Sequence, residues 1–163
     1  MLDNRKVIID DLCCLNNSTQ ILAASSAGSV DGITKAFDTG GGYTDGMFVV
    51  DVDAYAGNSA AASTHTIDII LEGSTTSTFT AYAALASFRL GQNAADFAHT
   101  RLGAGYTGDA STGCSFTPTT VVLKKPFHNM FADAIYRWLR VYCAFNGTVD
   151  STSIKYSAWI SKL

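Results

Sequence analysis

Two aspartates have the spacing most suggestive of chemistry in this 163-residue sequence. Asp51 and Asp53 lie in the alternating segment Met47–Ala56, so a strand there would place both carboxylates on one face, roughly 7 Å apart. Carboxylate pairs serve glycoside hydrolases and calcium sites. Because no third acid or catalytic neighbour accompanies this pair, we interpret it as the solvated outer face of a strand. A hydrolase built on Asp51 and Asp53 is the weakest functional alternative.

The other residue types that support catalysis or metal binding occur without the necessary spacing. The sequence contains three histidines and four cysteines: His65, His99, His128, Cys13, Cys14, Cys114 and Cys143. None has the H-x-x-x-H or C-x-x-C spacing of a metal site, and no phosphate-binding loop or G-x-S-x-G elbow is present. We therefore expect a protein that is not an enzyme and that has no catalytic residue, metal or cofactor. The cysteines are assigned as small hydrophobic residues.

The N-terminus and the charge restrict the compartment and the partners. The opening segment MLDNRKVIIDDL lacks the apolar region of a signal peptide, which predicts reduced cysteines and synthesis in a cytoplasm. The net charge of −3 gives no reason to expect binding to nucleic acid or to an anionic membrane. No run of residues approaches the ~20 apolar positions that span a bilayer.

Composition and periodicity predict an all-β fold. The sequence has thirteen aspartates and only one glutamate, Glu72. Asp favours turns, whereas Glu favours helices. The period-two alternation of half-buried strands occurs in Met47–Ala56, His65–Glu72, Arg137–Phe145 and Ile154–Ile160. We expect an antiparallel β-sandwich in which the first two segments pair as neighbours. The last two are expected to follow each other through the turn Asn146-Gly147 as a hairpin.

The same alternation predicts the core and the weaker elements. The expected inward residues are Phe48, Val50, Val52, Ala54, Ile67, Ile69, Leu71, Leu139, Val141, Cys143 and Phe145. Phe79–Leu90 is rich in alanine like a helix, yet it contains Thr80, Tyr82 and Phe88 like a strand; we favour a strand, with a helix as the alternative. Val121–Lys124 is a short strand that should stop before Pro126, and Phe127–Ala134 is a connecting segment with at most one helical turn.

Residues 1–30 lack the apolar pattern of the rest of the chain, which gives a division into an arm, 1–30, and a sandwich domain, 31–163. Such an arm becomes ordered only by docking, because fixing each backbone residue costs roughly 1–2 kcal/mol. We expect it to lie against a neighbouring subunit or against a larger structure that the protein binds, and the sandwich to fold without residues 2–24.

A set of outward aromatic and basic residues is the candidate interface. Trp138, Arg140 and Tyr142 share the outward side of one predicted strand, and Trp159 faces outward on another. Trp, Tyr and Arg are enriched in protein-interface hot spots. The pair Lys124-Lys125 is expected to meet an acidic protein patch. The competing interpretation is that the Trp138–Tyr142 face packs on the arm of the same chain.

The order of several segments resembles the capsid cement, or decoration, proteins of tailed bacteriophages. The resemblance rests on Met1-Leu2-Asp3, Ile9-Asp10-Asp11, the small-residue stretch Ala24–Asp31, Gly41-Gly42, Met47–Val52 and Thr66–Gly73. It rests also on a C-terminal signature formed by Tyr136, Leu139, Arg140, Tyr142, Gly147 and Thr148. The long Gly-rich middle, Gly91–Thr117, and Trp138 depart from the family pattern.

This resemblance implies a fold, a location and partners. The fold would be a jelly-roll-like antiparallel β-sandwich with an N-terminal arm. The protein would be made in the host cytoplasm and would sit on the outer face of the virion capsid. There it would bridge subunits of the major capsid protein as a homo-oligomer, with a trimer preferred to a dimer. The alternative is a carbohydrate- or receptor-binding module of a phage tail or fibre, in which Trp138, Tyr142 and Trp159 stack on sugar rings.

Overall fold

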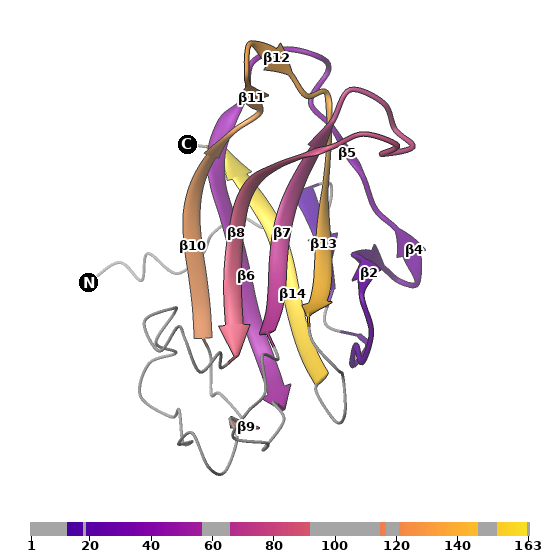
Figure 1. The fold of residues 1–163 in the computed structure, drawn as a ribbon, viewed down its shortest axis with the longest axis vertical. Helices are drawn as coiled ribbons and strands as arrows, with labels where there is room; N and C mark the ends of the chain where they lie inside the picture. The colour runs from indigo at the N-terminus through magenta and orange to yellow at the C-terminus, as the bar shows by residue number, and fades with distance from the viewer. Residues whose placement is uncertain are drawn as a thin grey trace, which may run out of the picture.

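Two antiparallel sheets pack face to face (Figure 1). The computed structural model describes residues 13–17, 19–56, 66–91, 115–116, 121–146 and 153–162. Sheet A contains, in order, β1 (Cys14–Asn16), β14 (Ser153–Lys162), β6 (Asp45–Ala56) and β10 (Val121–His128), and β9 (Ser115–Phe116) also pairs with β6. Sheet B contains, in order, β2 (Ser26–Ala27), β13 (Trp138–Asn146), β7 (Thr66–Ser74) and β8 (Ala83–Gly91), and β5 (Phe37–Asp38) also pairs with β13. The predicted all-β antiparallel sandwich is confirmed, whereas a jelly-roll order of the strands stays a prediction.

Two short hairpins project from these sheets. One pairs β3 (Ser29–Val30) with β4 (Ile33–Thr34), and the other pairs β11 (Met130–Phe131) with β12 (Ala134–Ile135). The described part of the chain includes no helix that is long and apolar enough to cross a membrane. The residues His65, His99, Cys114 and Gly147 and the segment Val7–Ile9 lie outside the described residues.

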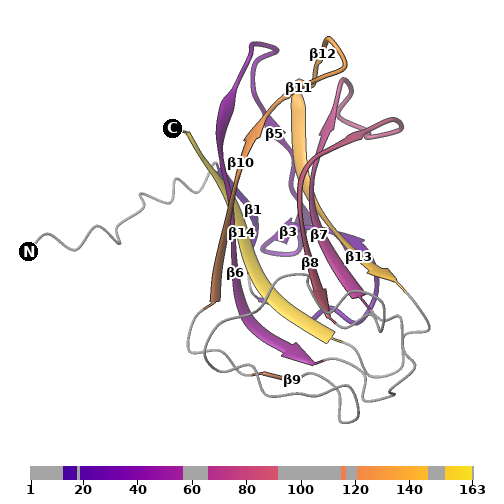
Figure 2. The same cartoon turned by 60° about the vertical axis from the view of Figure 1, so that its left-hand side comes forward.

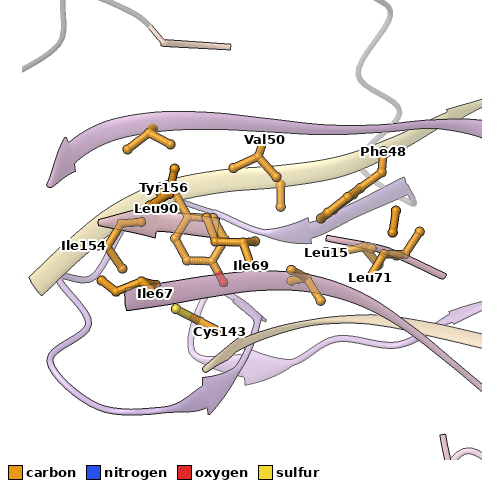
Figure 3. Packing of buried hydrophobic residues seen from close by; sticks show 14 of the residues in the cluster. Leu15, Phe48, Val50, Ile67, Ile69, Leu71, Leu90, Cys143, Ile154 and Tyr156 are labelled. Atoms are coloured by element: carbon orange, nitrogen blue, oxygen red, sulfur yellow. The ribbon is translucent and has the colours of Figure 1, made fainter. Parts of the chain in front are cut away.

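The inward sides of the two sheets form one apolar core (Figure 3). The six predicted core residues of β7 and β13 that are 0% exposed are Ile67, Ile69, Leu71, Leu139, Val141 and Cys143. They face Phe48, Val50 and Val52 on β6 and Ile154, Tyr156, Ala158 and Ile160 on β14. Because successive side chains of a strand point to opposite faces, the buried face fixes the register of each strand.

β6 departs from the predicted alternation near its end. Ala54 is predicted in the core, but it is only half-buried, and Tyr55 is the core residue there. The pairing of β6 with β14 shifts register between Lys155 and Tyr156. An extra residue at such a bulge moves the following side chain to the other face of the strand.

Two predicted strand pairings are wrong. β6 and β7 are expected as neighbours, and β13 and β14 as a hairpin, but in each case the two strands belong to opposite sheets. β6 pairs with β14 and β10, whereas β7 pairs with β13 and β8. Alternation shows which face of a strand is buried. It does not show which sheet contains the strand, since both sheets bury one face toward the same core.

Three weaker assignments also need correction. β10 continues through Pro126 to His128, because β10 is an edge strand of sheet A and the missing proline N–H costs nothing on an open edge. The segment Phe127–Ala134, expected as a connection, contains the end of β10 and most of the β11–β12 hairpin. In the segment Phe79–Leu90 only the part from Ala83 is strand β8, and Phe79 lies in the preceding loop.

The described residues of the predicted arm are part of the sandwich. β1 pairs with β14 and β2 pairs with β13. Leu15 is 0% exposed within the core, and Asn16 Nδ2 donates a hydrogen bond to the Tyr156 carbonyl at 2.7 Å. Asn16 Oδ1 also accepts from the Ser29 amide at 3.0 Å. The boundary predicted at residue 30 therefore does not separate residues 13–30 from the domain, and residues 1–12 lie outside the described part.

Candidate functional site

Three of the six predicted interface residues share the outer face of sheet B. Trp138, Arg140 and Tyr142 are half-buried and alternate along β13 with core residues. In the register with β7, Arg140 lies opposite Glu72 and Tyr142 lies opposite Ile70. The three side chains therefore form a stripe along one strand, as the alternation of the sequence predicts.

The guanidinium of Arg140 already has partners in its own chain. Its Nε lies 2.7 Å from Oε2 of Glu72, and the exposed fractions of the two side chains are 18% and 2%. The guanidinium carbon lies 4.3 Å from the ring centroid of Phe79, 5.5 Å from that of Tyr142 and 5.9 Å from that of Tyr82. Aromatic faces attract such a cation. Arg140 is thus the centre of an aromatic-lined ion pair that holds the fold together.

Phe79 reaches this ion pair because the β7–β8 loop folds back over sheet B. The Ser74 hydroxyl donates to the Ala81 carbonyl at 2.7 Å, and the Phe79 amide donates to the Thr76 carbonyl at 3.3 Å. Phe79 has a φ of 52°, a left-handed conformation that bulky residues rarely adopt. Burial of its ring, which is 6% exposed, offsets that strain. Sequence reasoning missed this role, because Phe79 fits a strand pattern.

Two further ion pairs among the described residues also have both partners within the chain. Arg89 contacts Asp68 through two hydrogen bonds of 2.7 and 2.9 Å, and Arg137 contacts Asp38 through two of 2.8 Å. The hydrogen bond from Arg137, followed by the backbone hydrogen bond from Gly40, lowers the pKa of Asp38 to about 2. The outer face of sheet B therefore presents mainly neutral and internally paired groups, which suit contact with a protein surface more than with an ionic ligand.

Trp159 lies on a different surface from Trp138. It is opposite Val49 in sheet A, next to the core residue Ala158, and so it points to the outer face of that sheet. The residue is only 9% exposed, and its indole Nε1 is buried without a hydrogen-bond partner among the described residues. Trp159 therefore does not join the predicted interface and cannot present its ring to a ligand.

Lys124 and Lys125 lie on the edge strand β10, on opposite faces. Lys124 is exposed and opposite Val49. Lys125 is on the inward side, opposite Phe48, and its Nζ donates to the Ser87 carbonyl of β8 at 3.2 Å. Together with Pro126, these lysines are typical of an edge strand that is protected from pairing with another chain. The contact of Lys125 with Ser87 indicates a structural role for this lysine at the seam between β10 and β8.

Asp51 and Asp53 lie on the outer face of sheet A and form no metal centre with other described residues. Among the described residues, no group of three or more His, Cys, Asp or Glu side chains could hold a metal ion. Burial, followed by the nearby Asp53 carboxylate, raises the pKa of Asp51. Oδ1 of Asp51 is buried without a hydrogen-bond partner. The two carboxylates thus repel each other on a partly covered surface.

One end of the sandwich collects exposed apolar side chains that the sequence reasoning did not select. The loop before β6, the β7–β8 loop and the β11–β12 hairpin lie at the upper end in both views (Figures 1 and 2). They include five of the eight large hydrophobic residues exposed in the described chain: Tyr43, Tyr82, Met130, Phe131 and Ile135. We call these five residues the apolar end. Since single exposed hydrophobic residues are normal, it is their collection at one end that indicates a binding surface.

The sequence contains one signal that could have located the hairpin of the apolar end. Two apolar pairs, Met130-Phe131 and Ala134-Ile135, flank two residues, the second of which is Asp133. A gap of two residues between two short apolar runs is the spacing of a tight hairpin. The signal is weak because neither Asn-Gly nor Asp-Gly occupies the turn. By contrast, Asp31-Gly32 marks the β3–β4 hairpin clearly.

Comparison of the chain with protein-family models, curated protein sequences and solved structures finds no match in any of the three.

Proposed function

We propose that this protein is a non-catalytic, structural component of a tailed-phage virion that decorates and cements the exterior of the capsid. The observation that supports it best is the apolar end, where Tyr43, Tyr82, Met130, Phe131 and Ile135 are 39–59% exposed. Exposed apolar residues gathered in one region mark protein contact sites. The identity of the partner, the major capsid protein, rests on the resemblance of the sequence to decoration proteins.

Cementing by such a protein works through several simultaneous contacts. A small homo-oligomer, preferably a trimer, has several identical binding surfaces arranged by its symmetry. When each copy contacts a different capsid subunit, the second and third contacts form at a high effective concentration. Movement of one subunit must then break several contacts together. The jelly-roll-like strand order belongs to the same proposal.

A carbohydrate- or receptor-binding module of a tail or fibre is the alternative. The buried position of Trp159 weakens it, since only Trp138 and Tyr142 of the three proposed stacking residues share a face. In addition, the ring of Trp138, one of these two residues, already has the guanidinium carbon of Arg137 at 5.4 Å from its centroid. A hydrolase built on Asp51 and Asp53 is weaker still, because the carboxylates face no other described acid, His or Cys cluster.

Decoration of shells in solution tests the proposal. Capsid shells of the phage that encodes this chain are assembled without it, mixed with the purified protein and sedimented. We expect saturable co-sedimentation with a fixed number of copies per shell, and a higher temperature of shell disruption. Cryo-electron microscopy of the same sample should place the protein on the outer surface. Absence of co-sedimentation, together with selective binding on a glycan array, would favour the carbohydrate-binding alternative.

A further inference from the structure

We propose that the β11–β12 hairpin, residues 129–136, is the anchor of the capsid contact. Its apolar tip would insert into an apolar cleft of the major capsid protein that has a Lys or Arg at its rim. This inference rests on the proposed function and names the contacting element and the chemistry of its partner. The hairpin lies at the upper end of the sandwich in Figures 1 and 2.

The tip exposes large apolar side chains on both of its faces. Phe131 is 58% exposed, Ile135 40% and Met130 39%. Met130 pairs with Ile135 across the hairpin, so these two side chains share one face. Phe131 is the next residue along the strand and points to the opposite face, so an apolar cleft that encloses the tip would contact both faces. Burial of these three side chains by a partner would remove apolar surface from water, which is the main favourable term in protein association.

The root of the hairpin is rigid, in contrast to its exposed tip. Asn129 is 0% exposed, and its Oδ1 accepts a hydrogen bond of 2.7 Å from the Thr44 amide. Its Nδ2 donates to the carbonyls of Gly42, at 2.9 Å, and Tyr136, at 3.1 Å. Its backbone amide donates to Thr44 O at 2.9 Å, and its carbonyl accepts from Tyr136 N at 2.7 Å. A hairpin held in this way loses little conformational freedom when it binds.

The turn of the hairpin is not the one that stability alone would select. Ala132 and Asp133 have φ values of 48° and 63°, so both central residues are left-handed, as in a type I′ turn. Asp tolerates this conformation, whereas Ala does not and Gly would suit it. In the β3–β4 hairpin the same positions are Asp31 and Gly32, with φ values of 53° and 80°. Strained backbone of this kind is concentrated at functional sites.

The charge of the tip selects the class of partner. Asp133 is the only Asp, Glu, Lys or Arg residue of the hairpin, and it is exposed. A symmetric tip-to-tip contact between two copies would bring two Asp133 carboxylates together, because a two-fold interface joins the same surface patch of both copies. An anionic membrane surface would repel the same carboxylate. A different protein with an apolar cleft and a cationic rim fits both the apolar residues and the acid.

The test compares three variants with the wild-type protein in the shell co-sedimentation assay. Phe131→Ser removes the largest side chain of the tip. Ile33→Ser is the matched control, because Ile33 is 72% exposed on the other two-residue hairpin. Asp133→Asn removes the charge while keeping a residue that tolerates the left-handed turn. Thermal melts show that each variant is folded, and light scattering gives its mass. Vesicles of dioleoyl phosphatidylcholine are the membrane probe.

We expect Phe131→Ser to weaken shell binding by about tenfold or more, as for a hot-spot residue, and Ile33→Ser to bind as the wild type does. Asp133→Asn should bind more weakly and show less dependence on salt.

Equal binding by Phe131→Ser and wild type overturns the inference and leaves the proposed function intact. Absence of wild-type binding overturns both. A drop in oligomer mass in Phe131→Ser, or vesicle binding that depends on Phe131, assigns the tip to another occupant and also overturns the inference.

Discussion

The Cys143 thiol shows how burial of one residue produces a measurable pH dependence. Burial, followed by the Asp68 carboxylate, raises the pKa of this thiol from 9.0 to about 12. Above the ordinary thiol pKa the unfolded chain loses the proton and the folded chain keeps it. The folded state then binds more protons, so its stability falls as the pH rises from about 9 to about 12. Part of the alkaline unfolding of this protein should therefore come from Cys143.

Chemical denaturation between pH 8 and pH 11 tests this prediction with Cys143→Ala as the comparison. The wild-type free energy of unfolding should fall more steeply with pH than that of the variant, with a difference of at most roughly 3 kcal/mol by pH 11, about two pH units above the ordinary thiol pKa. Parallel pH profiles would contradict it. The slope is the informative quantity, because the substitution also changes core packing at every pH.

Tyr156 gives a second prediction at the scale of one residue. Its hydroxyl is buried without a hydrogen-bond partner among the described residues, and Figure 3 shows the side chain extending across the core toward Cys143. A buried hydroxyl without a partner costs about 1–3 kcal/mol. Tyr156→Phe should therefore leave the free energy of unfolding unchanged or raise it, as denaturant midpoints would show. A loss of more than about 1 kcal/mol, the net contribution of one hydrogen bond, would indicate a partner for the hydroxyl.

At the scale of elements, the Glu72–Arg140 pair fixes the β7–β8 loop on sheet B. Arg140→Leu leaves the Glu72 carboxylate buried without its cation, and breaking a buried pair in this way costs about 3–5 kcal/mol. We expect Arg140→Leu to destabilise the fold by that order. Adding Glu72→Leu should recover much of the loss, since a buried pair replaced by apolar residues is often neutral. Denaturation of the two single variants and the double variant measures the coupling. Additive losses would contradict it.

The N-terminal strand is a second element whose role changes the expected result of truncation. From the sequence, deletion of residues 2–24 is expected to leave the sandwich folded. The deletion removes β1, the core residue Leu15 and both hydrogen bonds of Asn16. We now expect marked destabilisation, because loss of one large core side chain alone costs about 2–5 kcal/mol. Leu15→Ala is the milder comparison. A truncated protein with an unchanged melting temperature would show that β1 adds nothing to stability.

At the scale of the whole molecule, the location of the apolar end predicts how copies associate. If the hairpin tip meets the capsid, the contacts between copies must use other surfaces. We expect light scattering at micromolar concentration to give three copies of the 17.3 kDa chain, and Phe131→Ser to leave that mass unchanged. A 17.3 kDa species in solution, with isolated single copies on the shell, would contradict an oligomer.

The all-β class and most of the core could be predicted from the amino-acid sequence. Strand residues alternate between faces, so the apolar positions Ile67, Ile69 and Leu71 reveal their burial without any knowledge of the neighbouring strands. The same alternation placed Trp138, Arg140 and Tyr142 together on the opposite face of β13. These features depend on local periodicity, which a single segment contains in full.

Strand pairing and the accessibility of outward residues depend on contacts between distant parts of the chain. Outward Arg140 is enclosed because the Phe79 loop, distant in sequence, folds over it, and outward Trp159 is 9% exposed. Which sheet contains β6, β7, β13 or β14 depends on where the chain crosses from one sheet to the other. The alternation of apolar and polar residues is the same in either sheet. The apolar end likewise exists only because three loops, far apart in sequence, meet at one end of the sandwich.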